Sequence, residues 1–150
     1  MRALILASVV VVAACGRTGA NIDREGCTFL DGGPFTAITA GAAMDATAPA
    51  ITAAEGAFTI TLPAAGAGYL RFDSTDDTEY AVFTNRTVSV AAYTATGTAI
   101  PPSAMSTSSG ECATIMGRAI IELPVGPFYL AVGPDAGGPV NLVLRPYNPD

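Results

Sequence analysis

Four acidic side chains between residues 73 and 79 form the densest group in this sequence that could do chemistry. They are Asp73, Asp76, Asp77 and Glu79. Oxygen ligands gathered in one loop are what calcium requires, and the ion takes about six to eight of them. The spacing differs from that of an EF-hand loop, which needs a glycine and a later glutamate at fixed positions. Two interpretations stay open: a calcium site, or a solvated hairpin turn whose Asp side chains bond the local backbone.

Carboxylates could also work as a pair that hydrolyses a glycosidic bond, one as acid and the other as nucleophile or base. Glu122 is a fifth acid near a predicted strand. The sequence does not fix the separation of any two of these acids, so a small carboxylate-dependent hydrolase is an alternative only. Most other catalytic chemistry is excluded, because the chain has no His and all seven of its basic residues are Arg. An imidazole base and a Schiff-base lysine are therefore absent, and we expect no enzyme.

The charge balance limits the partners. Seven basic residues stand against thirteen acidic ones, for a formal net charge of -6. Nucleic-acid binding needs basic side chains that neutralise phosphates, and this sequence has no basic stripe. We therefore expect no nucleic-acid partner.

The first fourteen residues have the pattern of a signal peptide. Arg2 gives a short positive start, and residues 3–14 are an uninterrupted run of small and apolar residues that ends at Cys15. Such a run rises only about 18 Å as a helix, too little to cross a hydrocarbon core of about 30 Å. Its end, Val12-Ala13-Ala14-Cys15, resembles the lipobox of bacterial lipoproteins. The resemblance implies cleavage after Ala14 and lipidation of Cys15.

The lipobox resemblance implies a protein anchored to a membrane without spanning it, since two or more acyl chains hold a protein stably at a bilayer. Residue 16 is Gly and not the Asp that retains enteric-type lipoproteins in the inner membrane, so the expected location is the outer membrane of a bacterial cell envelope. The alternative is an ordinary secretory signal that happens to precede a Cys. Residues 15–26 are expected to be the lipidated N-terminus and a short tether, because residues 16–26 are polar and show no apolar period.

Two cysteines remain once Cys15 is set aside. Cys27 and Cys112 are an even pair in an exported protein, which indicates one disulfide. The bond would close a loop of about 85 residues and contribute about 4 to 5 kcal/mol in the chain-entropy description. A redox-active or metal-binding pair is the alternative, but it lacks the C-x-x-C spacing.

Residues 27–150 are expected to form one all-β domain. Apolar and polar residues alternate, as at Phe58, Ile60 and Leu62, and a period of two is that of a half-buried strand. No stretch strongly favours a helix. The sequence predicts a single antiparallel β-sandwich of the jelly-roll or Ig-like type with about seven to nine strands. The predicted strands are 58–62, 69–72, 80–84, 88–93, 118–123, 128–132 and 140–145, with an eighth at 35–38 and a short one at 50–53.

Three tyrosines have the parity of the outer face of the sandwich. Tyr69, Tyr93 and Tyr129 alternate with apolar neighbours that are expected to point inwards. Exposed rings can serve as a platform for a carbohydrate or peptide ligand. Ordinary packing on the face of a sheet is the alternative.

A looser resemblance covers residues 56 to 145. The segment Gly68-Tyr-Leu-Arg-Phe, the acidic turn from Asp73 to Tyr80, and Glu122-Leu-Pro-Val-Gly-Pro-Phe-Tyr-Leu130 resemble the bacterial pre-peptidase C-terminal type of β-sandwich. The long segment 99–113 departs from that pattern. The resemblance implies an accessory, non-catalytic module.

The preferred interpretation is a lipid-anchored envelope lipoprotein that acts as a non-catalytic interaction or structural module. Its expected partners are the membrane, through the anchor, and an envelope protein or glycan. A calcium- or polysaccharide-binding module and the small hydrolase are the alternatives. No cofactor is expected apart from calcium in the first of these alternatives.

Overall fold

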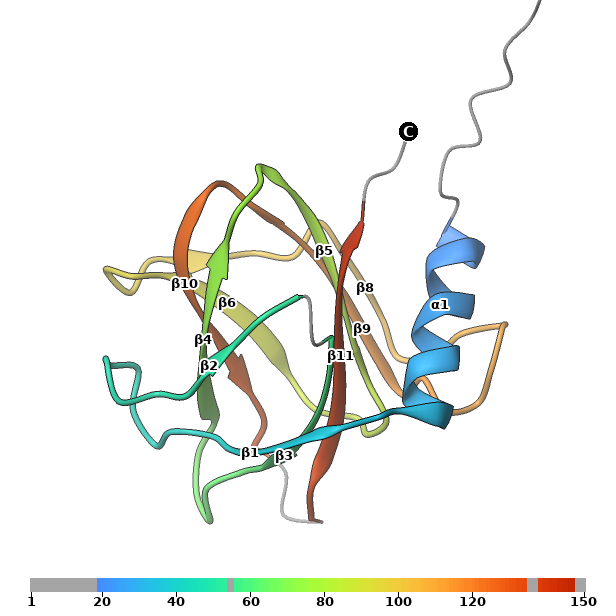
Figure 1. The fold of residues 1–150 in the computed structure, drawn as a ribbon, viewed down its shortest axis with the longest axis horizontal. Coiled ribbons are helices and arrows are strands. Elements are labelled where there is room, and N and C mark those ends of the chain that lie inside the picture. The colour runs from blue at the N-terminus through green and yellow to red at the C-terminus, as the bar shows by residue number, and fades with distance from the viewer. Residues whose placement is uncertain (1–18, 54–55, 135–137, 148–150) are drawn as a thin grey trace, which may run out of the picture.

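Two β-sheets packed face to face form the body of the protein, as the computed structural model shows (Figure 1). The structure describes residues 19–53, 56–134 and 138–147, so the signal segment 1–14 and Cys15 lie outside the described residues. The six-stranded sheet has the order β1-β3-β11-β5-β9-β8, and the five-stranded sheet has the order β2-β4-β10-β6-β7. The strands are β1 (Thr36–Thr39), β2 (Ala50–Ile51), β3 (Ala57–Thr61), β4 (Gly68–Ser74), β5 (Thr78–Thr84), β6 (Val90–Thr94), β7 (Ala99–Ile100), β8 (Ala104–Ser106), β9 (Gly117–Leu123), β10 (Gly126–Val132) and β11 (Val140–Tyr147).

The all-β sandwich is confirmed, and every run predicted to be a strand contains one. Two details differ from the expectation. The sheets are mixed, because β1 pairs with β3 and β2 pairs with β4 in parallel. Between β1 and β3 the chain passes through β2, and between β2 and β4 it passes through β3. In both cases the intervening strand lies in the other sheet, so the chain returns to the first sheet in its original direction. The described strands number eleven rather than seven to nine, since β7 and β8 add short edge strands of two and three residues.

The main core lies between the two sheets and is built from alternate residues of the strands. Leu70 and Phe72 of β4 point into it beside Leu130 of β10, the neighbouring strand of the same sheet, and all three are at most 2% exposed. The aromatic pair Phe72 and Tyr80 closes one end of this core in an edge-on contact, with ring centroids 4.9 Å apart. Burial of apolar area on this scale is the main term that stabilises a sandwich.

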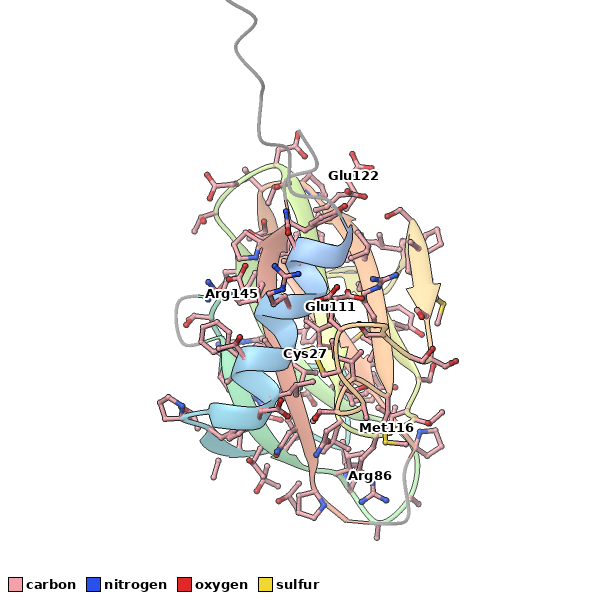
Figure 2. All side chains as sticks on the ribbon, turned by 90° about the vertical axis from the view of Figure 1, so that its right-hand side faces the viewer. Cys27, Arg86, Glu111, Met116, Glu122 and Arg145 are labelled. Carbon is pink, nitrogen blue, oxygen red and sulfur yellow. A yellow bond between two sulfur atoms is a disulfide. The ribbon has the colours of Figure 1, made fainter. Side chains whose placement is uncertain are left out.

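One helix, α1 (Gly19–Gly32), lies on the outer face of the six-stranded sheet, beside β11 and β5 (Figures 1 and 2). Residues 19–26, which we expected to be tether, are therefore the first part of this helix. Ile22 and Leu30 form its buried stripe with Gly26 between them. That stripe continues past residue 26 and packs against strands far along the chain, so residues 16–26 alone carry no sign of it.

The residue that follows the helix is a glycine in the left-handed conformation. Gly33 has a φ of 59°, and its N–H donates to the carbonyl of Phe29 at 2.9 Å. This closure is the usual way in which an orphan carbonyl at a helix C-terminus is satisfied. No helix within the described ranges has the length and apolar content needed to cross a bilayer.

Candidate functional site

The structure does not bring the four calcium candidates together. Asp73 points outwards from the five-stranded sheet, where it lies opposite Pro127, whereas Glu79 lies on the outer face of the other sheet. Asp76 and Asp77 are exposed in the turn between β4 and β5. Within the described ranges, no group of three or more acidic, Cys or His side chains is placed to hold a metal ion.

The acidic turn instead carries short-range hydrogen bonds from its own hydroxyl groups. Ser74 donates to the carbonyl of Asp76 at 2.7 Å, and the hydroxyl of Thr75 lies 2.9 Å from a carboxylate oxygen of Asp76. The turn is therefore solvent-exposed, as in the alternative to calcium, but it connects two sheets and is not a hairpin, and these side-chain bonds come from Ser74 and Thr75.

The predicted disulfide is confirmed. Cys27 of α1 is bonded to Cys112 in the loop between β8 and β9, with 6.0 Å between the Cα atoms. The bond covers a sequence separation of 85 residues. It therefore ties α1 to the loop between β8 and β9.

Ion pairs add to the attachment of α1. Asp23, which is 6% exposed, receives a bond of 2.6 Å from Nη1 of Arg118 and one of 2.8 Å from Ser109. Glu25 pairs with Arg145 of β11 at 2.6 Å, and the same guanidinium lies 4.7 Å from the ring centre of Phe29. A buried carboxylate without such partners would be costly, so these contacts fix the helix in one position.

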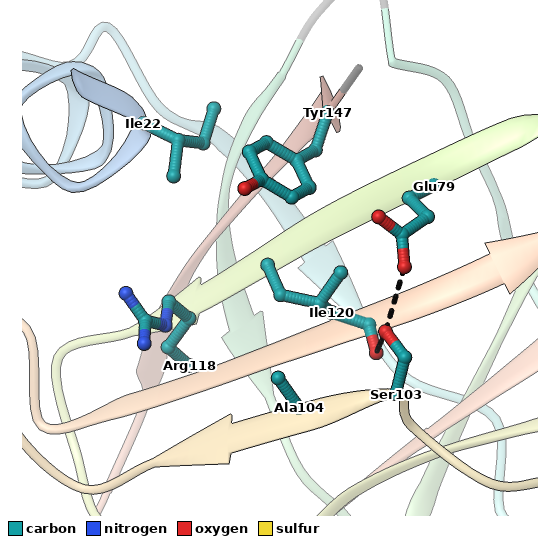
Figure 3. Close-up of a pocket in the computed structure, with 7 residues that line it drawn as sticks. All are labelled: Ile22, Glu79, Ser103, Ala104, Arg118, Ile120 and Tyr147. Atoms are coloured by element: carbon teal, nitrogen blue, oxygen red, sulfur yellow. Dashed lines mark hydrogen bonds between the residues drawn. The ribbon is translucent and has the colours of Figure 1, made fainter. Parts of the chain in front are cut away.

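A pocket of about 290 Å³ opens on the outer face of the six-stranded sheet, beside the first turns of α1 (Figure 3). Ile120 of β9 lies in the centre of this view, with Arg118 on one side and Glu79 and Ser103 on the other. Ala104 is paired with Ile120 across β8 and β9, so both side chains face the pocket. The lining residues are Ile22, Glu79, Ser103, Ala104, Arg118, Ile120 and Tyr147. We call this cavity the helix-side pocket.

The polar groups of the helix-side pocket have unused bonding capacity. Ser103 donates to Oε1 of Glu79 at 2.7 Å, which leaves Oε2 of that carboxylate to accept a further bond. Arg118 uses Nη1 for Asp23, and its Nε, which has no hydrogen-bond partner in the described structure, is buried beyond the reach of a ligand. A bond into the pocket therefore has to come from the exposed part of a side chain that is 22% exposed. The pocket thus combines an apolar floor with a donor at one side and an acceptor at the other.

The register of β5 and β9 places Glu79 directly opposite Glu122. Facing residues on neighbouring strands have Cβ atoms about 4.5 to 5.5 Å apart, so the structure brings these two of the five candidate acids together. Glu122, however, does not line the helix-side pocket. Two-carboxylate hydrolysis needs both groups beside the bond to be cleaved, and the described pocket wall supplies Glu79 alone.

The outer face of the five-stranded sheet carries the three tyrosines, as their parity predicts. Tyr129 of β10 lies between Arg71 of β4 and Tyr93 of β6, and Tyr69 is one row further along. All four side chains are half-buried. Arg71 also donates to the carbonyl of Ala46 at 3.3 Å. We call this surface, made of Tyr69, Arg71, Tyr93 and Tyr129, the tyrosine face.

Sequence reasoning missed most of the helix-side pocket, because it singled out only Glu79 among the lining residues. One signal was present: β5, β9 and β11 are apolar at successive positions, as in Ala119-Ile120-Ile121. A strand that is apolar on both faces is covered on both faces.

Neither a scan against models of protein families nor a search of curated proteins found a match for this chain.

Proposed function

We propose that this protein is a lipid-anchored lipoprotein of a bacterial cell envelope and that its domain is a non-catalytic module that binds a partner. The observation that carries the proposal is Cys15, which directly follows an apolar run of signal-peptide length. Acyl chains on that residue would hold the mature chain at a membrane surface. The resemblance of residues 56 to 145 to accessory sandwich modules supports the same function.

The short distance between Cys15 and the fold supports a domain held close to the bilayer. Gly19 begins α1, so four residue steps separate the anchor from the helix, and these span at most about 14 Å. The start of α1 and the end of β11 lie at the same end of the sandwich (Figure 1). The disulfide and the ion pairs of α1 would pass any pull on the anchor directly to the sheets.

Two surfaces of the domain are suited to binding, the helix-side pocket and the tyrosine face. The tyrosine face offers three half-buried rings and a guanidinium on a sheet that no helix covers in the described structure. Aromatic side chains with a polar end are common at interfaces, since they bury area and still form hydrogen bonds. This surface favours a polysaccharide-binding module as a second candidate function, within the same envelope location.

Lipid labelling tests the anchor. Cells that produce the full chain are fed a labelled fatty acid, and we expect label on the wild-type protein and none on Cys15→Ser. The matched control is Cys27→Ser, which loses the disulfide and should keep the label. Equal labelling or equal membrane partitioning of Cys15→Ser and the wild type would contradict the proposal.

Residue 16 tests the expected membrane. In a two-membrane host with enteric-type sorting, the wild type should fractionate with the outer membrane, and Gly16→Asp should move it to the inner membrane. Gly16→Ser is the control and should not move it. A wild-type protein found in the inner membrane would overturn the location and leave the anchor intact.

A further inference from the structure

We infer that the helix-side pocket binds one uncharged sugar ring, either a unit of an envelope glycan or the head group of a glycolipid. This inference deepens the ligand-binding part of the proposed function and does not depend on the anchor. It is drawn from the size of the pocket, its apolar floor and the opposite hydrogen-bonding characters of its two sides.

The size of the pocket limits the ligand to one ring. Its volume of about 290 Å³ lies just below the range of about 300 to 1,000 Å³ that small-molecule sites occupy. The floor is formed by Ile120 and Ala104, and Ile22 forms part of the wall. The ring of Tyr147 lies over the other side of the floor (Figure 3). A flat ring with C–H groups on its faces matches such a floor.

The charges around the pocket favour a neutral ligand. A carboxylate only accepts hydrogen bonds and a guanidinium only donates them. A ligand with a single charge would be attracted by one of these groups, Glu79 or Arg118, and repelled by the other, so a charge of either sign brings no clear net advantage. A hydroxyl group both donates and accepts, so a ring that bears several hydroxyls can bond Glu79 and Arg118 at once.

The polar groups are held in place before any ligand arrives. Ser103 fixes the carboxylate of Glu79 through a bond of 2.7 Å, and Asp23 fixes the guanidinium of Arg118 through one of 2.6 Å. Asp23 lies in α1, so the position of Arg118 depends on the helix that Cys27 holds in place. Groups held in this way lose little freedom when a ligand binds, which favours affinity.

The test is an amide NMR titration of the processed protein in a sugar-free detergent. The titrants are glucose, galactose and N-acetylglucosamine, with glucuronate as an anionic sugar, glucosamine as a cationic sugar and glycylglycine as a zwitterion that is not a sugar. We expect at least one neutral sugar to shift the amides of Ser103, Ala104 and Ile120, with a dissociation constant in the millimolar range typical of so small a ligand. The charged compounds should bind more weakly.

Two variants separate the pocket from the surrounding sheet. Glu79→Ala should weaken sugar binding by about tenfold, since it removes a hydrogen bond to a charged group. Glu122→Ala removes the carboxylate on the opposite strand, which does not line the pocket, and should leave binding unchanged. Equal loss in both variants would contradict the assignment of the pocket.

Vesicles distinguish the two sources of the ring. If the ligand is a lipid head group, vesicles that contain monoglucosyl diacylglycerol should bind the protein more tightly than free glucose does. If it is a glycan unit, free sugar and vesicles should bind alike. No shift with any neutral sugar up to about 100 mM, shifts confined to the tyrosine face, or tighter binding of a charged relative would each overturn the inference, while lipid labelling at Cys15 would be unaffected.

Discussion

The two outer faces of the sandwich differ in what covers them. The six-stranded sheet presents Ala81, Phe83 and Val143 outwards, each 0% exposed beneath α1 and the disulfide loop. The five-stranded sheet presents Tyr93, Tyr129 and other half-buried side chains, and no described helix lies over it. One sheet face has thus become the wall of a second core, and the other remains available to a partner.

The covered face shows how a short helix, α1, is kept in place over a sheet. α1 has only fourteen residues, and isolated helices of about that length are marginal in water. Its buried stripe, the Cys27 bond and the ion pairs of Asp23 and Glu25 together hold it against the sheet. The tyrosine face needs no such cover, because Tyr and Arg side chains expose polar ends to water.

Loss of the disulfide that holds α1 against the six-stranded sheet should lower the stability of the protein more than truncation of a single side chain on either face. The double variant Cys27→Ala/Cys112→Ala is expected to lower the free energy of unfolding by about 4 kcal/mol, since the bond closes a long loop in the unfolded chain. Denaturant unfolding measures this value. A loss below about 1 kcal/mol would mean that the cover does not depend on the bond.

Truncation of one side chain on each face compares them directly. Leu30→Ala removes a residue that is 4% exposed under the cover and should cost about 3 kcal/mol. Tyr129→Ala on the tyrosine face should cost about 1 kcal/mol or less, the scale of a cross-strand pair. Equal losses in denaturant unfolding would show that the tyrosine face is as tightly packed as the covered one.

Two glycines of α1 test how closely the helix approaches the sheet. A Cβ on Gly26 would lie 2.9 Å from the ring of Phe83, whereas one on Gly32 would have nothing within 4 Å. Gly26→Ala should therefore destabilise the protein by about 1 to 3 kcal/mol. Gly32→Ala should be neutral or stabilise by up to about 1 kcal/mol. Thermal melting of both variants measures the difference, and a stabilising Gly26→Ala would show that the helix can move away.

The smallest effect concerns the loop that runs along the edge of the tyrosine face. Hydrogen bonds from the hydroxyl and the N–H of Thr47 hold the pKa of Asp45 below its usual value of 3.8. The stabilising contribution of this carboxylate is present above pH 3.8 and is lost as the pH falls through the lower folded-state pKa. An NMR titration of Asp45 should show the lowered pKa, and Thr47→Val should raise it towards 3.8. Equal pKa values in the two proteins would contradict this assignment.

The alternation of residues made the strands predictable. Phe58, Ile60 and Leu62 signal β3 because the period of a strand is local, and the same rule gave the outward direction of Tyr129. The acidic residues were harder to place. Asp73 and Glu79 are six residues apart, yet they point away from opposite sheets, because the chain crosses from β4 in one sheet to β5 in the other.

The sequence by itself determined the all-β class, the described strands other than β7 and β8, the disulfide partners and the lack of His and Lys side chains, because each follows from residue type, parity or count. Only the tertiary structure decided that residues 19–26 are helical, that this helix is what covers the six-stranded sheet, and that Glu79, Ser103 and Arg118 surround one pocket. These features depend on contacts such as Asp23 with Arg118, which are 95 residues apart. No local period records such contacts, since their free energy appears only when distant elements pack together.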